Sequence, residues 1–244
     1  MPCSRRCRCC RVPPTRWRGY SARHSGSRAL PGKALTLGSP ASPSPLILPR
    51  TRSTRLDRLL ADIAACRACA LPHEPRPVVQ AGAHARLLIV GQAPGRRVHE
   101  TGIPWNDPSG DLLRTWLQLT PEQFYDAGKV AIVPMGLCYP GKGASGDLPP
   151  RRECAPLWHA PLLASMPDIR LTLLVGRHAQ ACYLGSRAGA TLADTVAACA
   201  DYLPAFFPLP HPSPRNRFWL RRHPWFDTDV LPRLRQQVAL ALSG

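Results

Sequence analysis

The amino-acid sequence predicts an α/β protein: a three-layer α/β/α sandwich around a central four-stranded, mainly parallel sheet. Four short apolar runs lead to this prediction, at residues 87–90, 130–133, 171–175 and 206–209. Continuous apolar runs are typical of strands that are covered on both faces. Amphipathic stretches, such as 112–119 and 178–184, lie between the runs. Strands that alternate with helices favour a parallel sheet with helices on both sides.

The chain divides into two regions of different composition. Residues 1–53 are rich in Arg, Pro, Ser and Cys and have no helical or strand periodicity, so we expect a disordered tail. Two other interpretations of this segment are an organelle transit peptide and a misassigned start codon. Residues 54–244 are expected to form one domain. Its first helix should begin at Thr54, a good capping residue, because apolar residues follow at helical spacing: Leu56, Leu59, Leu60 and Ile63.

The net charge of +17 is unevenly distributed along the chain. Residues 1–55 hold eleven Arg and one Lys with no Asp or Glu. Such a segment would bind almost any polyanion, so its charge says little about a specific function. No apolar run reaches the roughly 18 residues that a membrane-spanning helix needs, so we expect no membrane partner.

Glycine, proline and polar residues follow each of the four predicted strands. The segments concerned are 91–95, 134–138, 176–178 and 210–214. Open α/β sheets bind their ligands at the carboxyl ends of their strands. The sequence therefore predicts a single site assembled from four loops.

Three short motifs in this region point to a family. Gly91-Gln92-Ala93-Pro94-Gly95 follows the first strand, Gly102-Ile103-Pro104-Trp105 comes next, and His211-Pro212-Ser213-Pro214 follows the last strand. Neither a GxxxxGK[ST] nor a GxGxxG pattern occurs in the first loop, which weakens a nucleotide-cofactor reading. The combination G-x-A-P-G, G-x-P-aromatic and H-P-S-P resembles the uracil-DNA glycosylase superfamily, especially its iron–sulfur-containing bacterial and archaeal branch, over roughly residues 55–244.

The resemblance implies a DNA glycosylase, a hydrolase that flips out a deaminated or damaged base and cleaves its N-glycosidic bond in base excision repair. Uracil is the first substrate to expect. The partner would be DNA that contains a damaged base, and the protein would be a cytoplasmic, nucleoid-associated monomer of a bacterium.

The resemblance also suggests roles for individual residues. Trp105 would stack on the extruded base, and His211 would donate a hydrogen bond to the departing base oxygen. Gln92 would help to shape the pocket, and Asp107, Glu100 and His99 are the nearby groups that could orient water. The base-binding wall is assigned to Ala93, Pro94, Gly95 and Pro134. DNA contacts are assigned to Ser213, Arg215, Asn216, Arg217 and Phe218.

Four cysteines match the order of the branch's cluster ligands. Cys66 and Cys69 form a C-x-x-C pair, Cys138 follows the second strand, and Cys154 comes sixteen residues later. Four thiolates are the usual ligands of a [4Fe–4S] cluster, which would be structural here. Zinc is the alternative, since tetrahedral sulfur ligation suits either metal. Four unrelated buried cysteines are the remaining reading.

The sequence departs from the family's pattern at three places. Gln92 stands where the branch carries a glutamate, Pro134 where it carries a base-reading asparagine, and Val98-His99 where it carries an acidic pair. Two other functions therefore stay open. One is a superfamily member without catalysis that binds DNA or a modified base. The other is a metal-binding regulatory protein that contacts nucleic acid through its tail.

Overall fold

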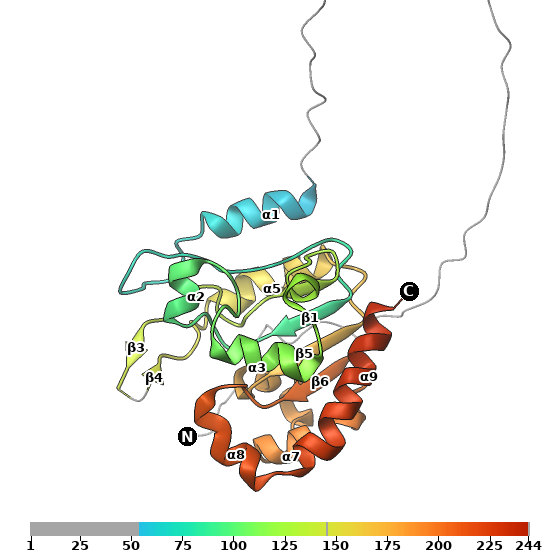
Figure 1. Cartoon of the computed structure of the whole chain (residues 1–244). Helices are drawn as coiled ribbons and strands as arrows, with labels where there is room; N and C mark the ends of the chain where they lie inside the picture. Colours follow the sequence, from blue (N-terminus) through green and yellow to red (C-terminus); the bar gives the residue numbers. More distant parts are fainter. Residues whose placement is uncertain (1–53, 145, 244) are drawn as a thin grey trace, which may run out of the picture. The chain divides into compact units, whose positions relative to one another are not determined.

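A four-stranded parallel sheet forms the centre of the computed structural model, which describes residues 54–144 and 146–243 (Figure 1). The predicted tail, residues 1–53, lies outside the described residues. The strand order is β2-β1-β5-β6, with every neighbouring pair parallel. The strands are β1 (Leu87–Val90), β2 (Val130–Ile132), β5 (Leu171–Val175) and β6 (Phe206–Leu209). The predicted α/β class and all four predicted strands are confirmed.

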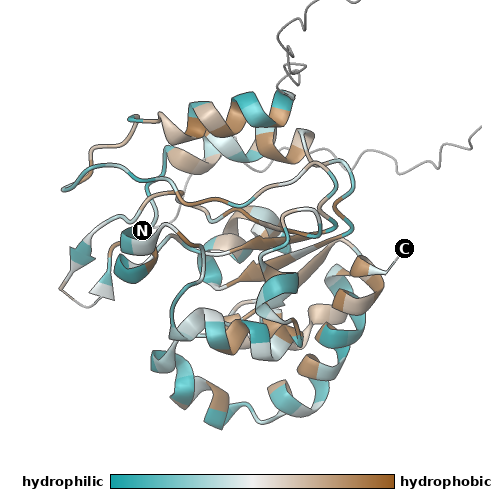
Figure 2. Ribbon diagram, turned by 45° about the horizontal axis from the view of Figure 1, so that its top comes forward, coloured by the Kyte–Doolittle hydropathy of each residue, from teal (hydrophilic) through white to brown (hydrophobic). Residues whose placement is uncertain are grey.

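Helices cover both faces of the sheet, as the continuous apolar runs predict. Leu88 and Val90 pack in one buried cluster with residues of α1 (Arg55–Ala64), α5 (Cys154–Ala164) and α6 (Arg177–Leu184). Leu87 and Ile89 pack in the other cluster, on the opposite face. That cluster includes residues of α3 (Pro108–Leu117), α7 (Leu192–Ala197) and α9 (Leu231–Leu242). Figure 2 shows the apolar strands enclosed between helices whose outer faces are polar.

Local capping chemistry determines where the helices begin. Thr54 and Asp57 form a reciprocal capping box at the start of α1, which satisfies two backbone N–H groups that the first turn leaves unpaired. Asp107 caps α3 by accepting a hydrogen bond from the Gly110 amide at 2.8 Å. Pro108 follows it at the first helical position, where a missing N–H costs nothing.

Pro208 lies inside β6, which is compatible with the sheet because β6 is an edge strand.

The order of the strands reverses between β1 and β5, since the chain passes from β1 to β2 on one side and then to β5 on the other. Such a reversal opens a crevice at the carboxyl ends of the strands.

The remaining elements have two to six residues each and lie between those described above in the sequence. They are α2 (Arg96–Thr101), α4 (Pro121–Phe124), β3 (Lys142–Gly143), β4 (Gly146–Asp147), η2 (Gly185–Arg187), η3 (Cys199–Tyr202), η4 (Pro214–Asn216), α8 (Arg217–Arg222) and η5 (Phe226–Val230). β3 and β4 form an antiparallel hairpin apart from the main sheet. Within the described residues, none of the helices has the length and apolar character to cross a membrane.

Candidate functional site

The loops that follow neighbouring strands are hydrogen-bonded to one another in the register of the sheet. Beyond β1 and β2, the Met135 amide donates to the Gly91 carbonyl and the Gly136 amide to the Gln92 carbonyl, both at 2.9 Å. Beyond β5, the Gly176 amide donates to the carbonyl of Leu209, the last residue of β6, at 2.8 Å. The ladder thus extends past β1, β2 and β5, so the loops after these strands begin at fixed positions relative to the sheet.

These loops enclose a cavity of about 730 Å³ at the carboxyl ends of the strands. This volume is in the range of sites that bind small organic molecules. The cavity lining includes residues from all four loops: Gly91, Gln92, Ala93, Pro94, Gly95, Pro134, Gly176, His211 and Ser213. Trp105 and Asp107, from the segment before α3, also line it. The structure therefore brings together the residues that the sequence assigned to catalysis and base binding.

Trp105 has a left-handed backbone conformation, with φ of 55°. This conformation is unusual for a bulky residue and is found where the surroundings enforce it. Here the Trp105 carbonyl lies against Gly110, where a Cβ atom would come within 1.7 Å of its oxygen. Arg114 donates a hydrogen bond to the same oxygen at 3.3 Å. Only glycine at position 110 allows this approach, which directs the Trp105 side chain into the cavity lining.

His211 packs beside Trp105, with the two ring centroids 5.4 Å apart and the rings tilted by 34°. Its Cβ atom is 3.5 Å from the position that a Cβ would occupy on Gly176. The Asn216 side-chain amide donates to the His211 carbonyl at 2.7 Å and holds the loop. Burial lowers the pKa of His211, and the nearby Asp107 carboxylate opposes this shift. His211 is therefore set up as a neutral hydrogen-bond donor at neutral pH.

Pro134 offers the cavity no side-chain amide, and its carbonyl accepts a hydrogen bond from His159. His159 is buried in α5, with Nε2 3.0 Å from the Pro134 oxygen and Nδ1 2.8 Å from the Tyr183 hydroxyl. Burial lowers the pKa of His159, and the bond to Pro134 opposes the shift. A neutral imidazole that donates through Nε2 and accepts through Nδ1 satisfies both partners.

Several cavity residues were not assigned by the sequence. Arg177 and His178, at the start of α6, line the cavity, as do Gly146, Asp147 and Leu148 from the β3–β4 segment. The expectation that ligands bind at the carboxyl ends of the strands placed the segment 176–178 at the site, but it assigned no role to the side chains of that segment. The sequence did not predict the β3–β4 hairpin, because its two-residue strands contain glycine and are too short to show alternating apolar and polar residues.

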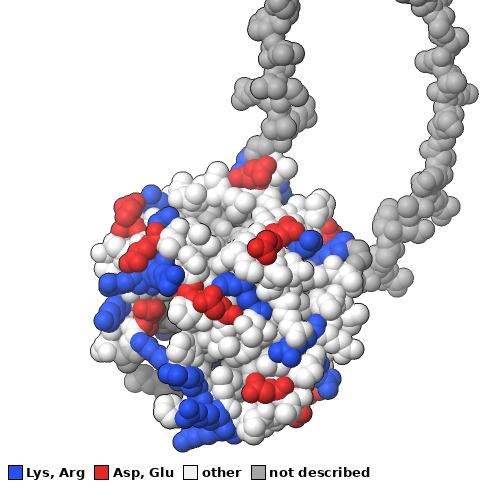
Figure 3. Space-filling model, in the orientation of Figure 1, with Lys and Arg blue, Asp and Glu red and all other residues white. Residues whose placement is uncertain are grey.

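The residues assigned to DNA contact divide into two groups. Ser213, Arg215 and Asn216 line the cavity. Arg217 and Phe218 lie outside its lining, in α8, and Phe218 is 74% exposed. Figure 3 shows basic side chains along the edge of the molecule that carries α2, the hairpin and α8. The exposed ones in these elements are Arg96, Arg97, Lys142, Arg217, Arg221 and Arg222.

The four predicted ligand cysteines line a second, small hollow, formed by residues near α1, α5 and the loop after β2. Cys66, Cys69, Cys138 and Cys154 all contribute to its wall. Burial raises the pKa of the Cys138 thiol to about 11 and that of Cys154 to about 12, and neighbouring cysteines of the set add to both shifts. The Leu137 amide donates to Cys154 Sγ at 3.2 Å.

The donor set of this hollow suits a thiolate-bound metal or cluster. Four cysteines line one hollow, and the Leu137 amide donates to the sulfur of Cys154, as backbone N–H groups do around iron–sulfur clusters. In the atomic positions of residues 54–144 and 146–243, no group of three or more His, Cys, Asp or Glu side chains meets the geometry of a metal site. The chemical fit to a metal or cluster comes from the four cysteines that share the wall of this hollow.

Comparisons with known proteins agree with the motifs. The family model of the uracil DNA glycosylase superfamily matches residues 79–235, more than half of the chain. One similar solved structure is described as the "solution NMR structure of a putative uracil DNA glycosylase from Methanosarcina acetivorans". Its identity to this chain is 14% and its TM-score 0.38, over 64% of this chain and 93% of that one. At that score the structural likeness supports no further argument.

One buried and three half-buried histidines predict that the fold loses stability in mild acid. Burial lowers the pKa of His99, His159, His178 and His211 from 6.5. When the pH falls below the histidine pKa of the unfolded chain, the unfolded chain binds more protons than the folded chain. The free energy of unfolding therefore falls as the pH falls. We expect the melting temperature to drop between about pH 7.5 and 5.5, the range in which histidine titrates.

His159→Gln, which keeps a donor for the Pro134 carbonyl, should show a smaller drop over the same range. Differential scanning fluorimetry of the two proteins would measure both curves. An equal drop in the variant would show that His159 does not contribute to the acid sensitivity.

Proposed function

The chain belongs to the uracil DNA glycosylase superfamily, and we propose that it is a DNA glycosylase that removes a deaminated or damaged base by hydrolysis of its N-glycosidic bond. The observation that carries the proposal is the pair Trp105 and His211, whose rings lie 5.4 Å apart in one cavity of about 730 Å³. An aromatic surface and a neutral donor side by side suit a planar base that leaves with negative charge.

Binding begins with extrusion of the base from the DNA stack. The basic edge formed by α2, the hairpin and α8 would contact phosphates, as cationic surfaces of DNA-binding proteins do. Phe218 is exposed beside Arg217 and could occupy the space that the base leaves in the duplex. The extruded base would then stack on Trp105, whose backbone is fixed against Gly110 before DNA arrives. Such preorganisation lowers the cost of binding.

Cleavage breaks the bond between the base nitrogen and the sugar C1′ atom, and the electron pair leaves with the base. His211 would donate a hydrogen bond to the base oxygen on which this charge develops. A neutral imidazole suffices, because it donates through one ring nitrogen. Water then adds to the cationic C1′ atom. Asp107 uses Oδ1 to cap α3, so its second oxygen remains to orient that water.

Replacement of the base-reading asparagine by Pro134 leaves the choice of base open. The side chain of Pro134 cannot pair with a base edge, and its carbonyl already accepts from His159. This observation also favours a second candidate function, binding of a modified base or of DNA without cleavage.

A lesion panel separates these two functions. Purified protein would be incubated with single- and double-stranded oligonucleotides that contain uracil, hypoxanthine or xanthine, and alkali would then cleave the abasic sites. We expect strand scission with at least one lesion. His211→Ala should reduce it by about 100-fold or more, as loss of one transition-state donor does, while the affinity for the same DNA is retained. Lesion-selective binding with no scission would favour the binding function, and neither binding nor scission would contradict both.

We further propose that Cys66, Cys69, Cys138 and Cys154 hold a [4Fe–4S] cluster, with zinc as the alternative. The four thiols that line one hollow support this proposal. A bound cluster would supply no step of the reaction but would join α1 to the loop after β2 and to α5.

Protein prepared without oxygen should be brown, with broad visible absorption and bound iron and sulfide. Cys138→Ser and Cys154→Ser should each lose the iron and the colour. Cys199→Ala, a change at a buried cysteine that does not line the hollow, should keep both. Colourless protein with stoichiometric zinc would overturn the cluster assignment.

A further inference from the structure

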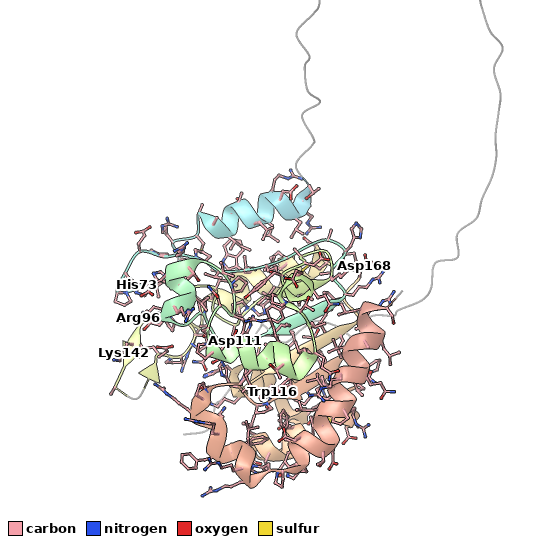
Figure 4. All side chains as sticks on the ribbon, viewed as in Figure 1. His73, Arg96, Asp111, Trp116, Lys142 and Asp168 are labelled. Atoms are coloured by element: carbon pink, nitrogen blue, oxygen red, sulfur yellow. The ribbon has the colours of Figure 1, made fainter. Side chains whose placement is uncertain are left out.

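The β3–β4 hairpin reaches the cavity from a segment that carries none of the family's motifs. It lies between Cys138 and Cys154, and the residues Gly146, Asp147 and Leu148 line the cavity. Figure 4 shows Lys142 of β3 on the same side of the molecule as His73 and Arg96, next to α2. The hairpin therefore adds a sixth segment to a site that is otherwise built from the four strand-end loops and the Trp105 segment.

Asp147 points toward the first loop of the cavity. Its Oδ2 atom is 3.6 Å from the position that a Cβ would occupy on Gly95, and Oδ2 of Asp107 is 3.9 Å from the same point. The two carboxylates thus approach the same glycine from different segments. Among the described residues that line the cavity, Asp107 and Asp147 are the acidic ones, because position 92 is glutamine.

The other oxygen of Asp147 is held by a tyrosine. The Tyr139 hydroxyl donates to Asp147 Oδ1 at 3.3 Å. Tyr139 is itself 6% exposed, and its ring stacks on His73 with centroids 5.3 Å apart and the planes 26° from parallel. A tyrosine fixed in this way holds one oxygen of Asp147 and leaves Oδ2 to face the cavity.

The backbone of the hairpin is fixed on the opposite side. Gly146 has φ of 139°, a conformation that favours glycine. A Cβ on Gly146 would come within 2.3 Å of a guanidinium nitrogen of Arg215. Arg215 can therefore pack directly on the hairpin next to Asp147. The Leu148 amide also donates to the Gly141 carbonyl at 2.9 Å, which closes the base of the hairpin.

We propose that Asp147 is a second catalytic carboxylate, which acts with Asp107 on the sugar and the attacking water. This inference rests on the proposed glycosylase function. As the C1′–N bond breaks and its electron pair leaves with the base, C1′ becomes cationic. The negative charge of Asp147 stabilises that cation. The water oxygen then forms the new bond to C1′, and the proton that water loses passes to a carboxylate and on to solvent. Tyr139 is the positioning residue for Asp147.

The test compares the rate of base release with the affinity for DNA. Single-turnover rates would be measured with protein in excess over the lesion oligonucleotide cleaved best by the wild-type protein. Affinity would be measured by fluorescence anisotropy with the same oligonucleotide carrying a 2′-fluoro sugar that resists cleavage. The variants are Asp147→Asn and Tyr139→Phe. Asp201→Asn, an exposed carboxylate that does not line the cavity, is the matched control.

Asp147→Asn should lower the rate by about 10-fold or more, which is less than the roughly 100- to 10,000-fold of a positioned acid–base group because a second carboxylate remains. Its affinity for the uncleavable DNA should be unchanged or tighter, because a negative charge near the phosphates is removed. Tyr139→Phe should lower the rate less and leave the affinity unchanged, and Asp201→Asn should alter neither.

Two results would overturn the assignment while the proposed function stands. One is active wild-type protein together with an Asp147→Asn variant that cleaves at the same rate. The other is a variant that loses rate, affinity and melting temperature together, which is the signature of a structural role. A wild-type protein that releases no base from any lesion would remove the glycosylase function and this inference with it.

Discussion

Hydrogen bonds that continue the parallel sheet beyond its strands hold the cavity in shape. Gly91 and Gln92 accept from the loop after β2, and Gly176 donates to the end of β6. Trp105 and His211, which are more than a hundred positions apart in sequence, lie against opposite parts of this frame. Loops that belong to the ladder cannot move independently of the core. Trp105 packs on Gly91 and His211 on Gly176, so both rings rest on loops that the sheet holds in place, as a preorganised site requires.

The cysteine hollow and the cavity share one segment of the chain. Cys138 follows the loop that contains Pro134, and Cys154 begins α5, which supplies the buried His159. The hairpin with Asp147 leaves and returns between these two cysteines. Fixing both thiols on one centre would restrict the ends of that segment, so the proposed cluster would help to position both the hairpin and the Pro134 loop. This connection would give the proposed cluster a structural role next to the proposed catalytic cavity.

The sequence predicted the parts of the structure that depend on local pattern. The apolar runs located every strand of the main sheet, and the Thr54 cap located α1. Glycine and proline after each strand indicated one site. The hairpin was not predicted, because its strands are too short to show a repeating pattern of apolar residues. Its position also depends on contacts with Tyr139 and Arg215, which are not local in the sequence. The sequence placed Arg177 and His178 at the predicted site but gave them no role, because a sequence does not show which side chains of a loop point into a cavity.

Trp105 and His211 line one cavity that we propose holds a single unstacked base, and the fluorescence of 2-aminopurine can report whether DNA delivers a base to it. The probe would be placed in duplex DNA next to the lesion that the wild-type protein releases fastest, where extrusion of the lesion unstacks the probe and raises its emission. The proposed site predicts an increase with His211→Ala protein, which should bind without efficient cleavage, and a loss of that increase when Trp105→Ala is added. Tight binding with no increase, or an increase that does not depend on Trp105, would contradict it.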